Sequence, residues 1–311
     1  MKIISDSKKN SSLYVDINLL EKKYPLIDSG SEGKVYKYNK DIAIKLFDIS
    51  KMPYRLNKIK ELCTLLDINF CFPIGLVHTN IDKIVGMRMA LINNLNGYGS
   101  FLNLILNFVP NGDIEFEKFK EILFKIDFAI KRVHNVGYTI GDLRPKNILI
   151  DDYNEPIFID TDSGTYKSYD YDFHYPMLDW AKNLYNHDFS YQDNDKYVWG
   201  IVFLESLLMY NSFNKRIYPF LALKMYQNKD GFEYLIKHLR ISKYMKELLT
   251  IIFSDAHDKP YIGEIFKDYD FEEQLLSTYS SNVYSFKYMK KKRWIIIYSS
   301  FGINYKKIYL R

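Results

Sequence analysis

The chain has 311 residues, of which 47% are hydrophobic and 26% are charged, and its formal net charge is +5. This composition excludes a disordered chain and fits one large core or two lobes that share a cleft. The only two cysteines, Cys63 and Cys71, exclude a disulfide framework and lack the spacing of zinc ligands. No apolar N-terminal stretch and no run of about 18 apolar residues is present, so we expect a cytoplasmic protein.

Strands dominate the first part of the chain. Residues 24–47 predict three strands separated by two turns, because segments rich in Val, Ile and Tyr alternate with short polar stretches that hold Gly, Ser or Asn. A helix is predicted over 54–66, where apolar residues recur on one face. Two further strands are predicted near 74–78 and 83–91.

Helices dominate after about residue 93. A long amphipathic helix is predicted over 115–135, with Gly137 as its stop, and a hairpin is predicted over 148–160. Further helices are predicted over 195–210, 215–227, 231–238 and 242–253. Strands followed by helices indicate an α+β chain with a sheet lobe and a helical lobe, and a ligand is expected in the cleft between them.

Two features of the first lobe favour phosphate binding. Gly30 and Gly33 lie in a turn between strands, where glycine lets the backbone approach phosphate oxygens. Lys45 lies in the apolar strand 42–47, where an ammonium group is costly unless it meets an anion. Glu61 on the following helix is a candidate partner that would hold Lys45 toward phosphates. The alternatives are an ordinary glycine hairpin, an edge-strand lysine and a solvated helix residue.

The segment 133–164 carries the strongest chemical pattern. Asp142 and Asn147 lie in a Pro-containing loop after the long helix, and Asp160 and Asp162 end the β-rich stretch that follows. Carboxylate and amide oxygens are suited to Mg²⁺, and Asp142 could orient a hydroxyl group and accept its proton. Arg144 could neutralise a phosphoryl group in transfer. A turn rich in Asp and Asn is the alternative explanation.

These residues together resemble a known family. GDLRPKN at 141–147 resembles the catalytic loop of protein kinases, HRDLKPEN in its usual form. Other motifs follow in the family's order: the glycine-rich loop over 28–35 with Asp28 in place of the first glycine, AIK at 43–45, Glu61, DKYVWG at 195–200 and DAHDKP at 255–260. The likeness covers about residues 20–270, and the ordered conjunction of motifs makes it specific.

The resemblance implies a two-lobed protein-kinase-like fold. The N-lobe, a small antiparallel β-sheet with one helix, would cover 20–92, and the larger, mainly helical C-lobe would cover 93–275. A 1–19 extension would precede them, and a basic extension over 276–311 would follow. The segment 284–311 contains Lys and Arg but no acid. We expect it to contact an anionic surface or partner, or to add a strand or hairpin to the helical lobe, and we do not expect nucleic acid as the partner.

The resemblance also assigns roles to residues, with ATP and Mg²⁺ as the cofactors. Catalytic roles would belong to Asp142, Arg144, Lys45 and Glu61. The nucleotide would be bound by Gly30, Gly33, Val35, Ala43, Lys45, Met89 and Leu91, with Met89 beside the adenine. The metal ligands would be Asn147 and Asp160, with Asp162 as the alternate to Asp160.

The chain also departs from the family. Ile140 and Gly141 replace the His and Arg that precede the catalytic Asp, and no APE triplet follows residue 163. Asp160 ends the apolar run IFI at the family's spacing from Asn147, whereas Asp162 begins the letters DSG, which resemble DFG. We therefore expect Asp160 to be the metal ligand.

The resemblance favours a Ser/Thr protein kinase that transfers the γ-phosphate of ATP to a protein hydroxyl. Arg144, two residues after Asp142, is typical of Ser/Thr kinases. Aminoglycoside and choline phosphotransferases share the pattern GDL…N…ID(W)D, so a small-molecule kinase is one alternative. A pseudokinase that binds nucleotide as a scaffold is the other, since the His and Arg are missing.

Overall fold

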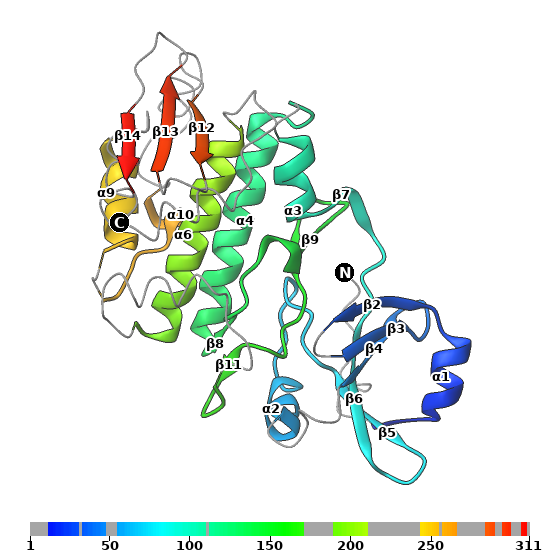
Figure 1. Ribbon diagram of the computed structural model, residues 1–311. Helices are drawn as coiled ribbons and strands as arrows, with labels where there is room; N and C mark the ends of the chain where they lie inside the picture. The colour runs from blue at the N-terminus through cyan, green and yellow to red at the C-terminus, as the bar shows by residue number, and fades with distance from the viewer. Residues whose placement is uncertain are drawn as a thin grey trace.

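The computed structural model has a mixed α+β architecture, with a six-stranded sheet at one end and helices at the other (Figure 1). None of the described helices combines the length and apolar character that crossing a membrane requires. The structure describes residues 12–30, 33–47, 55–109, 112–170, 189–210, 243–254, 257–265, 284–289, 294–299 and 306–309.

The six-stranded sheet has the order β1-β5-β6-β4-β3-β2, and its strands pair antiparallel except β1, which lies parallel to β5. The elements of this part are β1 (Leu13–Val15), α1 (Ile17–Lys23), β2 (Leu26–Gly30), β3 (Gly33–Lys37), β4 (Ile42–Phe47), α2 (Arg55–Leu62), β5 (Gly75–Thr79) and β6 (Ile84–Ala90). The predicted strands are confirmed, and the helix predicted over 54–66 is α2, which ends earlier. Part of the segment predicted as an extension therefore belongs to the sheet.

Both faces of this sheet are covered, so the prediction of a single helix was wrong. Side chains alternate along a strand, and Ile44 and Leu46 of β4 pack with Leu20 of α1 on one face. On the other face, Ala43 and Phe47 pack with residues of α2. A strand that is apolar on both faces needs a second cover, which α1 provides. Lys45 shares the α2 face.

The C-terminal part is built around α4 and α6. Its first elements are β7 (Leu95–Ser100), α3 (Phe101–Asn103), the π-helical turn η3 (Leu104–Phe108), α4 (Phe116–Asn135), β8 (Tyr138–Thr139) and the 3₁₀ turn η4 (Pro145–Asn147). They are followed by β9 (Ile148–Asp151), β10 (Pro156–Phe158), β11 (Thr165–Tyr166), α6 (Tyr191–Tyr210), α9 (Lys243–Ile252) and α10 (Ile262–Ile265). The predicted α4, its stop at Gly137 (φ +81°) and the β9–β10 hairpin are confirmed.

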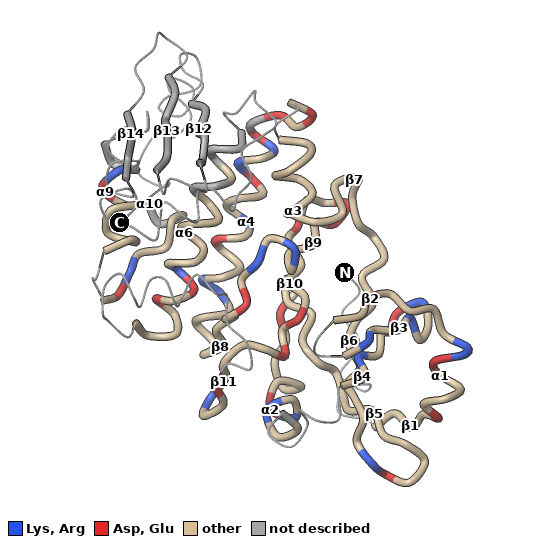
Figure 2. Tube along the Cα trace, viewed as in Figure 1, with Lys and Arg blue, Asp and Glu red and all other residues tan. Residues whose placement is uncertain are grey.

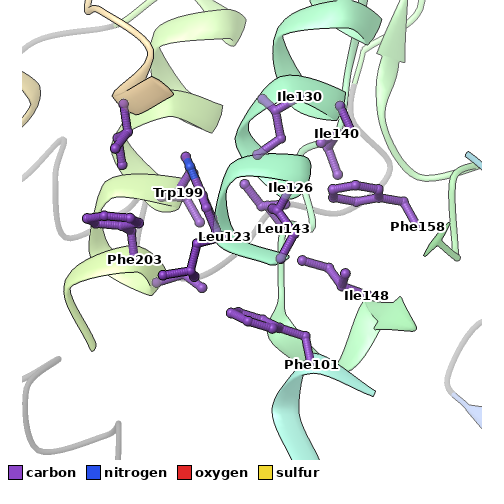
Figure 3. Packing of buried hydrophobic residues seen from close by; sticks show 14 of the residues in the cluster. Phe101, Leu123, Ile126, Ile130, Ile140, Leu143, Ile148, Phe158, Trp199 and Phe203 are labelled. Carbon is purple, nitrogen blue, oxygen red and sulfur yellow. The ribbon is translucent and has the colours of Figure 1, made fainter. Parts of the chain in front are cut away.

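The largest hydrophobic core lies in this part (Figure 3). Ile126 and Ile130 of α4 belong to the same cluster as Trp199 and Phe203 of α6. Apolar residues recur at helical spacing along α4, which gives that helix its buried face. The buried Asp127 ties three helices together: its carboxylate accepts hydrogen bonds from the Trp199 indole and from the backbone N–H groups of Ile262 and Gly263.

The C-terminal part also contains strands, so the expectation of a mainly helical lobe is met only in part. Strand β7 pairs with β9, and β11 pairs with β8. The basic tail forms a three-stranded antiparallel sheet of β12 (Tyr284–Met289), β13 (Trp294–Ser299) and β14 (Lys306–Tyr309). Strand formation in the tail is therefore confirmed. The helices predicted over 215–227 and 231–238 lie outside the described residues.

Candidate functional site

Lys45 lies on the middle of β4, between Val35 of β3 and Met87 of β6. Its side chain is buried, and its Nζ lies 2.8 and 3.0 Å from the two carboxylate oxygens of Asp162 and 3.3 Å from Asp160 Oδ1. These contacts join residues more than a hundred positions apart in the sequence. A buried ammonium needs this compensation, because desolvating an unpaired charge is costly. The carboxylates of Asp160 and Asp162 supply that compensation, while the expected contact of Lys45 with phosphates stays a prediction.

The two carboxylates differ in exposure. The side chain of Asp162 is 1% exposed, whereas that of Asp160 is 39% exposed. Backbone contacts hold the segment that carries them: Tyr138 Oη donates to the Thr161 carbonyl at 2.7 Å, and the Thr161 hydroxyl donates to the Cys71 carbonyl at 2.8 Å. Asp160 itself has φ +55°, a conformation that is uncommon outside glycine. The Asp162 carboxylate is thus buried against Lys45, while the Asp160 carboxylate is partly exposed to solvent.

The predicted Lys45–Glu61 ion pair was wrong. Glu61 Oε2 lies 2.5 Å from Lys167 Nζ, and both side chains are at the surface, 37% and 53% exposed. Glu61 is therefore at the rim of α2, away from Lys45, because Ile59, Leu62 and Cys63 take the buried face of the helix. The carboxylates that Lys45 needs come instead from the segment after β10.

Lys58 was not among the residues predicted for the site. This α2 residue is buried, and its Nζ donates to the carbonyls of Ser163, at 3.3 Å, and Asp170, at 2.9 Å. A lysine on an amphipathic helix is normally solvated, so no local signal marks it. Only the packing of α2 against β11 shows its position.

The loop that carries Asp142 is anchored on both sides by apolar residues. Ile140 and Leu143 are buried and point into the core that Figure 3 shows, next to α4. Asp142 lies between them in the sequence, and its carboxylate contacts Arg144 and Asn147. Gly141 has φ +72°, which a residue with a Cβ adopts only at a cost. Glycine at this position therefore lets the loop turn, whereas the protein-kinase loop that the sequence resembles usually has arginine there.

Asp195 of α6 holds this loop from behind. Its buried carboxylate accepts the backbone N–H groups of Ile140, at 2.6 Å, and Gly141, at 3.0 Å. His134 Nε2 lies 2.9 Å from the same carboxylate, and His134 Nδ1 lies 2.9 Å from Tyr261 Oη. Since a carboxylate only accepts, Nε2 carries the proton. The DKYVWG motif, which begins at Asp195, therefore fixes the backbone of the Asp142 loop.

Asp142 lies in a mixed environment. Arg144 Nε is 2.6 Å from its Oδ1, and Asn147 Nδ2 donates to its Oδ2 at 3.0 Å. Burial raises the pKa of the Asp142 carboxyl, and the charge of Asp160 raises it further, while Arg144, Asn147 and Lys146 oppose the rise. The segments that carry Asp142 and Asp160 adjoin, because the Ile159 N–H donates to the Asn147 carbonyl at 2.9 Å. A carboxylate whose charge is incompletely compensated is a better proton acceptor than a free one.

Asn147 and Asp160 carry the kinds of oxygen, amide and carboxylate, that a divalent cation would take as ligands. Among the described residues, no three His, Cys, Asp or Glu side chains are grouped as a metal site. The ligands expected from the sequence are different, because one of them is the amide of Asn147. Asn147 uses its Nδ2 to contact both the carbonyl and the carboxylate of Asp142, so its Oδ1 keeps its lone pairs. The segment of Asp160 adjoins Asn147, because the N–H of the preceding residue, Ile159, donates to the Asn147 carbonyl at 2.9 Å.

The residues expected around an adenine ring lie in one apolar cluster. Ala43 and Met89 are its buried members, and Val35 and Leu91 pack against it. Ile159 also belongs to this cluster and directly precedes Asp160. The apolar cluster is therefore next to the charged site, an arrangement suited to a ligand with a flat base and a polyanionic tail.

Gly30 and Gly33 face each other across the β2–β3 turn. At Gly33, with φ +149°, an added Cβ would lie 1.9 Å from the Leu46 carbonyl oxygen, so a side chain there would collide with β4. At Gly30 an added Cβ would meet nothing. Close packing of two strands therefore accounts for Gly33, while the role expected for both glycines beside phosphates stays a prediction.

Figure 2 shows acidic and basic residues interspersed along the described chain. The basic cluster over 290–293 lies outside the described residues, so contact with an anionic surface or partner stays a prediction. Arg144 and Asp142 lie together, as do Lys45, Asp160 and Asp162.

No protein-family model matches this chain, and no curated protein is similar to it in sequence.

Proposed function

We propose that this protein is an ATP-dependent phosphotransferase of protein-kinase-like, two-lobed fold, and that it phosphorylates Ser or Thr hydroxyl groups of proteins. One observation carries the proposal. Contacts join three separate segments beside the apolar cluster: β4 with Lys45, the loop with Asp142 and Asn147, and the segment with Asp160 and Asp162. Each of them has a chemical property that phosphoryl transfer needs.

The metal is expected at Asn147 and Asp160, through the amide oxygen and the exposed carboxylate. Mg²⁺, when bound, neutralises charge on the phosphate oxygens. Lys45 would exchange part of its contact with the two aspartates for contact with phosphate oxygens. Met89, Ala43, Val35 and Leu91 would hold the adenine through their apolar surface.

Asp142 acts on the acceptor hydroxyl. The hydroxyl oxygen forms a bond to the γ-phosphorus, the bond to the β–γ bridging oxygen breaks, and the hydroxyl proton passes to Asp142. ADP leaves with the bridging oxygen. The raised pKa of Asp142 favours proton acceptance, and the Asp195 network holds its loop in place. Arg144, next to Asp142, adds positive charge near the transferred group.

A small-molecule kinase is the second candidate, and one observation favours it. Asp160 and Asp162 both contact Lys45, and the segment IDTD at 159–162 resembles the ID(W)D pattern of aminoglycoside and choline phosphotransferases. Two acids at this site are a feature that those enzymes share in sequence. The acceptor therefore needs a direct test.

The test is transfer of labelled γ-phosphate from Mg-ATP to a generic protein substrate, to an aminoglycoside and to choline, each run in parallel. Labelled protein, with label removed by mild alkali as for phosphoserine, supports the main proposal. Label in the small molecules alone replaces it with the second candidate. Absence of transfer to all acceptors, together with ATP binding by calorimetry, would indicate a pseudokinase.

A further inference from the structure

The side chain of Lys58 is the feature of α2 that the proposed function leaves unexplained. Lys58 is 2% exposed, although it is a lysine on a helix whose neighbours Asn57 and Lys60 are exposed. Burying an ammonium group is unfavourable without polar partners. The carbonyls of Ser163 and Asp170 accept from its Nζ, so two backbone groups are among the polar partners of Lys58.

These two carbonyls lie at opposite ends of one short loop. Within the loop, the backbone groups of Tyr166 and Tyr169 exchange two hydrogen bonds, at 3.0 and 3.1 Å. Lys167, near the tip, has φ +55° and pairs with Glu61. Lys58 therefore holds the base of the loop from both sides, while Glu61 contacts its tip (Figure 1, α2 beside β11).

The base of this loop leads directly to the charged site. Ser163 follows Asp162, the closest partner of Lys45, and the Ser163 hydroxyl donates to the Asp160 carbonyl at 2.9 Å. A contact from Lys58 to the Ser163 carbonyl thus restrains the segment that carries both aspartates. In this way α2 is linked to Lys45 through Ser163 and Asp162, without an ion pair between Glu61 and Lys45.

We propose that Lys58 is a positioning residue, which couples helix α2 to Asp160 and Asp162 through the backbone of residues 163–170. The resemblance implied that Glu61 would couple α2 directly to Lys45. In this chain the link runs from Lys58 of α2 to the Ser163 backbone, and from the neighbouring Asp162 to Lys45. The catalytic consequence rests on the proposed phosphotransferase function. The structural consequence, that Lys58 orders the loop, does not.

The structural part is tested by hydrogen exchange on the full chain without nucleotide. Lys58→Met keeps the length and apolar body of the side chain but removes the charged donor. Because a charged hydrogen bond is lost at each end of the loop, exchange of the amides over 161–170 should become about tenfold faster or more. Lys60→Met, on the exposed side of the same helix, is the matched control and should leave exchange at the wild-type rate. Unchanged protection in Lys58→Met overturns the proposal.

A conservative variant separates positioning from general instability. Lys58→Arg keeps a charged donor, so protection of 161–170 should return at least in part, while α4 amides stay protected in all variants. If Lys58→Met instead accelerates exchange of 161–170 and α4 equally, it has lowered global stability, and the specific coupling is refuted. If Lys58→Arg is as poorly protected in the loop as Lys58→Met, the donor is not what matters, which also refutes it.

The catalytic part is tested by steady-state transfer. Loss of positioning should lower kcat by about tenfold, with KM for ATP changed by less than about threefold, because Asp160 and Asp162 remain present but are held less firmly. A wild-type kcat retained in Lys58→Met overturns the catalytic role. If wild type shows no transfer at all, the proposed function fails, and the exchange experiment still decides whether Lys58 orders the loop.

Discussion

The carboxylates of Asp195 and Asp162 are equally buried, each with about 1% of the residue exposed, but their partners differ. Asp195 is bound by two backbone N–H groups and an imidazole. Asp162 is bound by the ammonium of Lys45, which also reaches the exposed Asp160. Backbone donors cannot leave, whereas a lysine side chain can exchange one anion for another.

Burial alone therefore does not distinguish an aspartate that stabilises the fold from one that belongs to the candidate site. Asp195 binds the backbone of the Asp142 loop and His134, so these contacts explain its burial without a ligand. Lys45, by contrast, contacts two carboxylates, of which Asp162 is buried and Asp160 is partly exposed. We expect a ligand or metal to change the charge at this exposed carboxylate. Five predictions test the difference between the two aspartates.

Asp142→Asn should have the largest effect, because the site depends on a base there. Transfer should fall by about 10²–10⁴-fold, the usual contribution of a positioned proton acceptor. The measurement is kcat for transfer of labelled phosphate, with the variant's fold checked by circular dichroism. Asp152→Asn, an exposed acid on the β9–β10 hairpin, is the matched control and should keep wild-type kcat. A loss of less than tenfold would remove Asp142 from the mechanism.

Lys45→Met should destabilise the protein strongly, because it leaves Asp162 buried without its cation. Removing one partner of a buried pair costs about 3–5 kcal/mol of the free energy of unfolding. Adding Asp162→Asn should recover a large part of that loss, since the uncompensated charge disappears. Chemical denaturation of the two single variants and the double variant measures the coupling. Additive losses would contradict the pairing of Lys45 with Asp162.

Asp195→Asn should act on stability through the loop. An amide keeps one acceptor but turns an NH₂ group toward donors, so a charged hydrogen bond is lost. The expected decrease is about 1.5–3 kcal/mol in the free energy of unfolding, measured in urea. Transfer should fall only as far as the Asp142 loop is displaced. A variant as stable as wild type would show that the backbone contacts at Ile140 and Gly141 are dispensable.

Asp142 should also influence stability as pH changes. Burial raises the pKa of its carboxyl in the folded state above the ordinary value of 3.8, so the charged form opposes folding. The group's favourable contribution is therefore complete below that ordinary value and is lost as pH rises through the folded pKa. Asp142→Asn should accordingly raise the melting temperature at pH 7, with the gain shrinking as pH is lowered toward 3.8. A gain that grows in acid would mean that the pKa is lowered instead.

Glu61→Gln should have the smallest effect. The Glu61–Lys167 pair is at the surface, where water and salt screen it, so neither stability nor transfer should change measurably. The family resemblance, by contrast, implied a large loss of transfer. Side-by-side kinetics of Glu61→Gln and Lys58→Met compare the two α2 residues directly. A larger loss in Glu61→Gln would restore the ion pair with Lys45.

Much of the fold could be predicted from local pattern. The alternation over 24–47 predicted β2, β3 and β4, and the apolar spacing over 115–135 predicted α4 nearly to the residue. Gly137 stops that helix in the sequence and in the structure. These features depend on the periods of helices and strands and on the conformational freedom of glycine, all of which are local properties.

What needed tertiary structure was the choice of partners. The sequence predicted Glu61 as the partner of Lys45 and Asp160, with Asp162 as the alternate, as a metal ligand. Lys45 contacts the two aspartates instead, because the pairing depends on how α2 is rotated and on how closely the segment after β10 approaches β4. The burial of Lys58 and the role of α1 as a second cover of the sheet arise in the same way. Local pattern was enough to predict most of the helices and strands described, although not β1 or α1, and to single out Lys45, Asp142, Asn147, Asp160 and Asp162 as candidate site residues. It was not enough to predict which charged groups meet, because electrostatic partners lie far apart in the chain and are set by distances of a few ångströms in the packed protein.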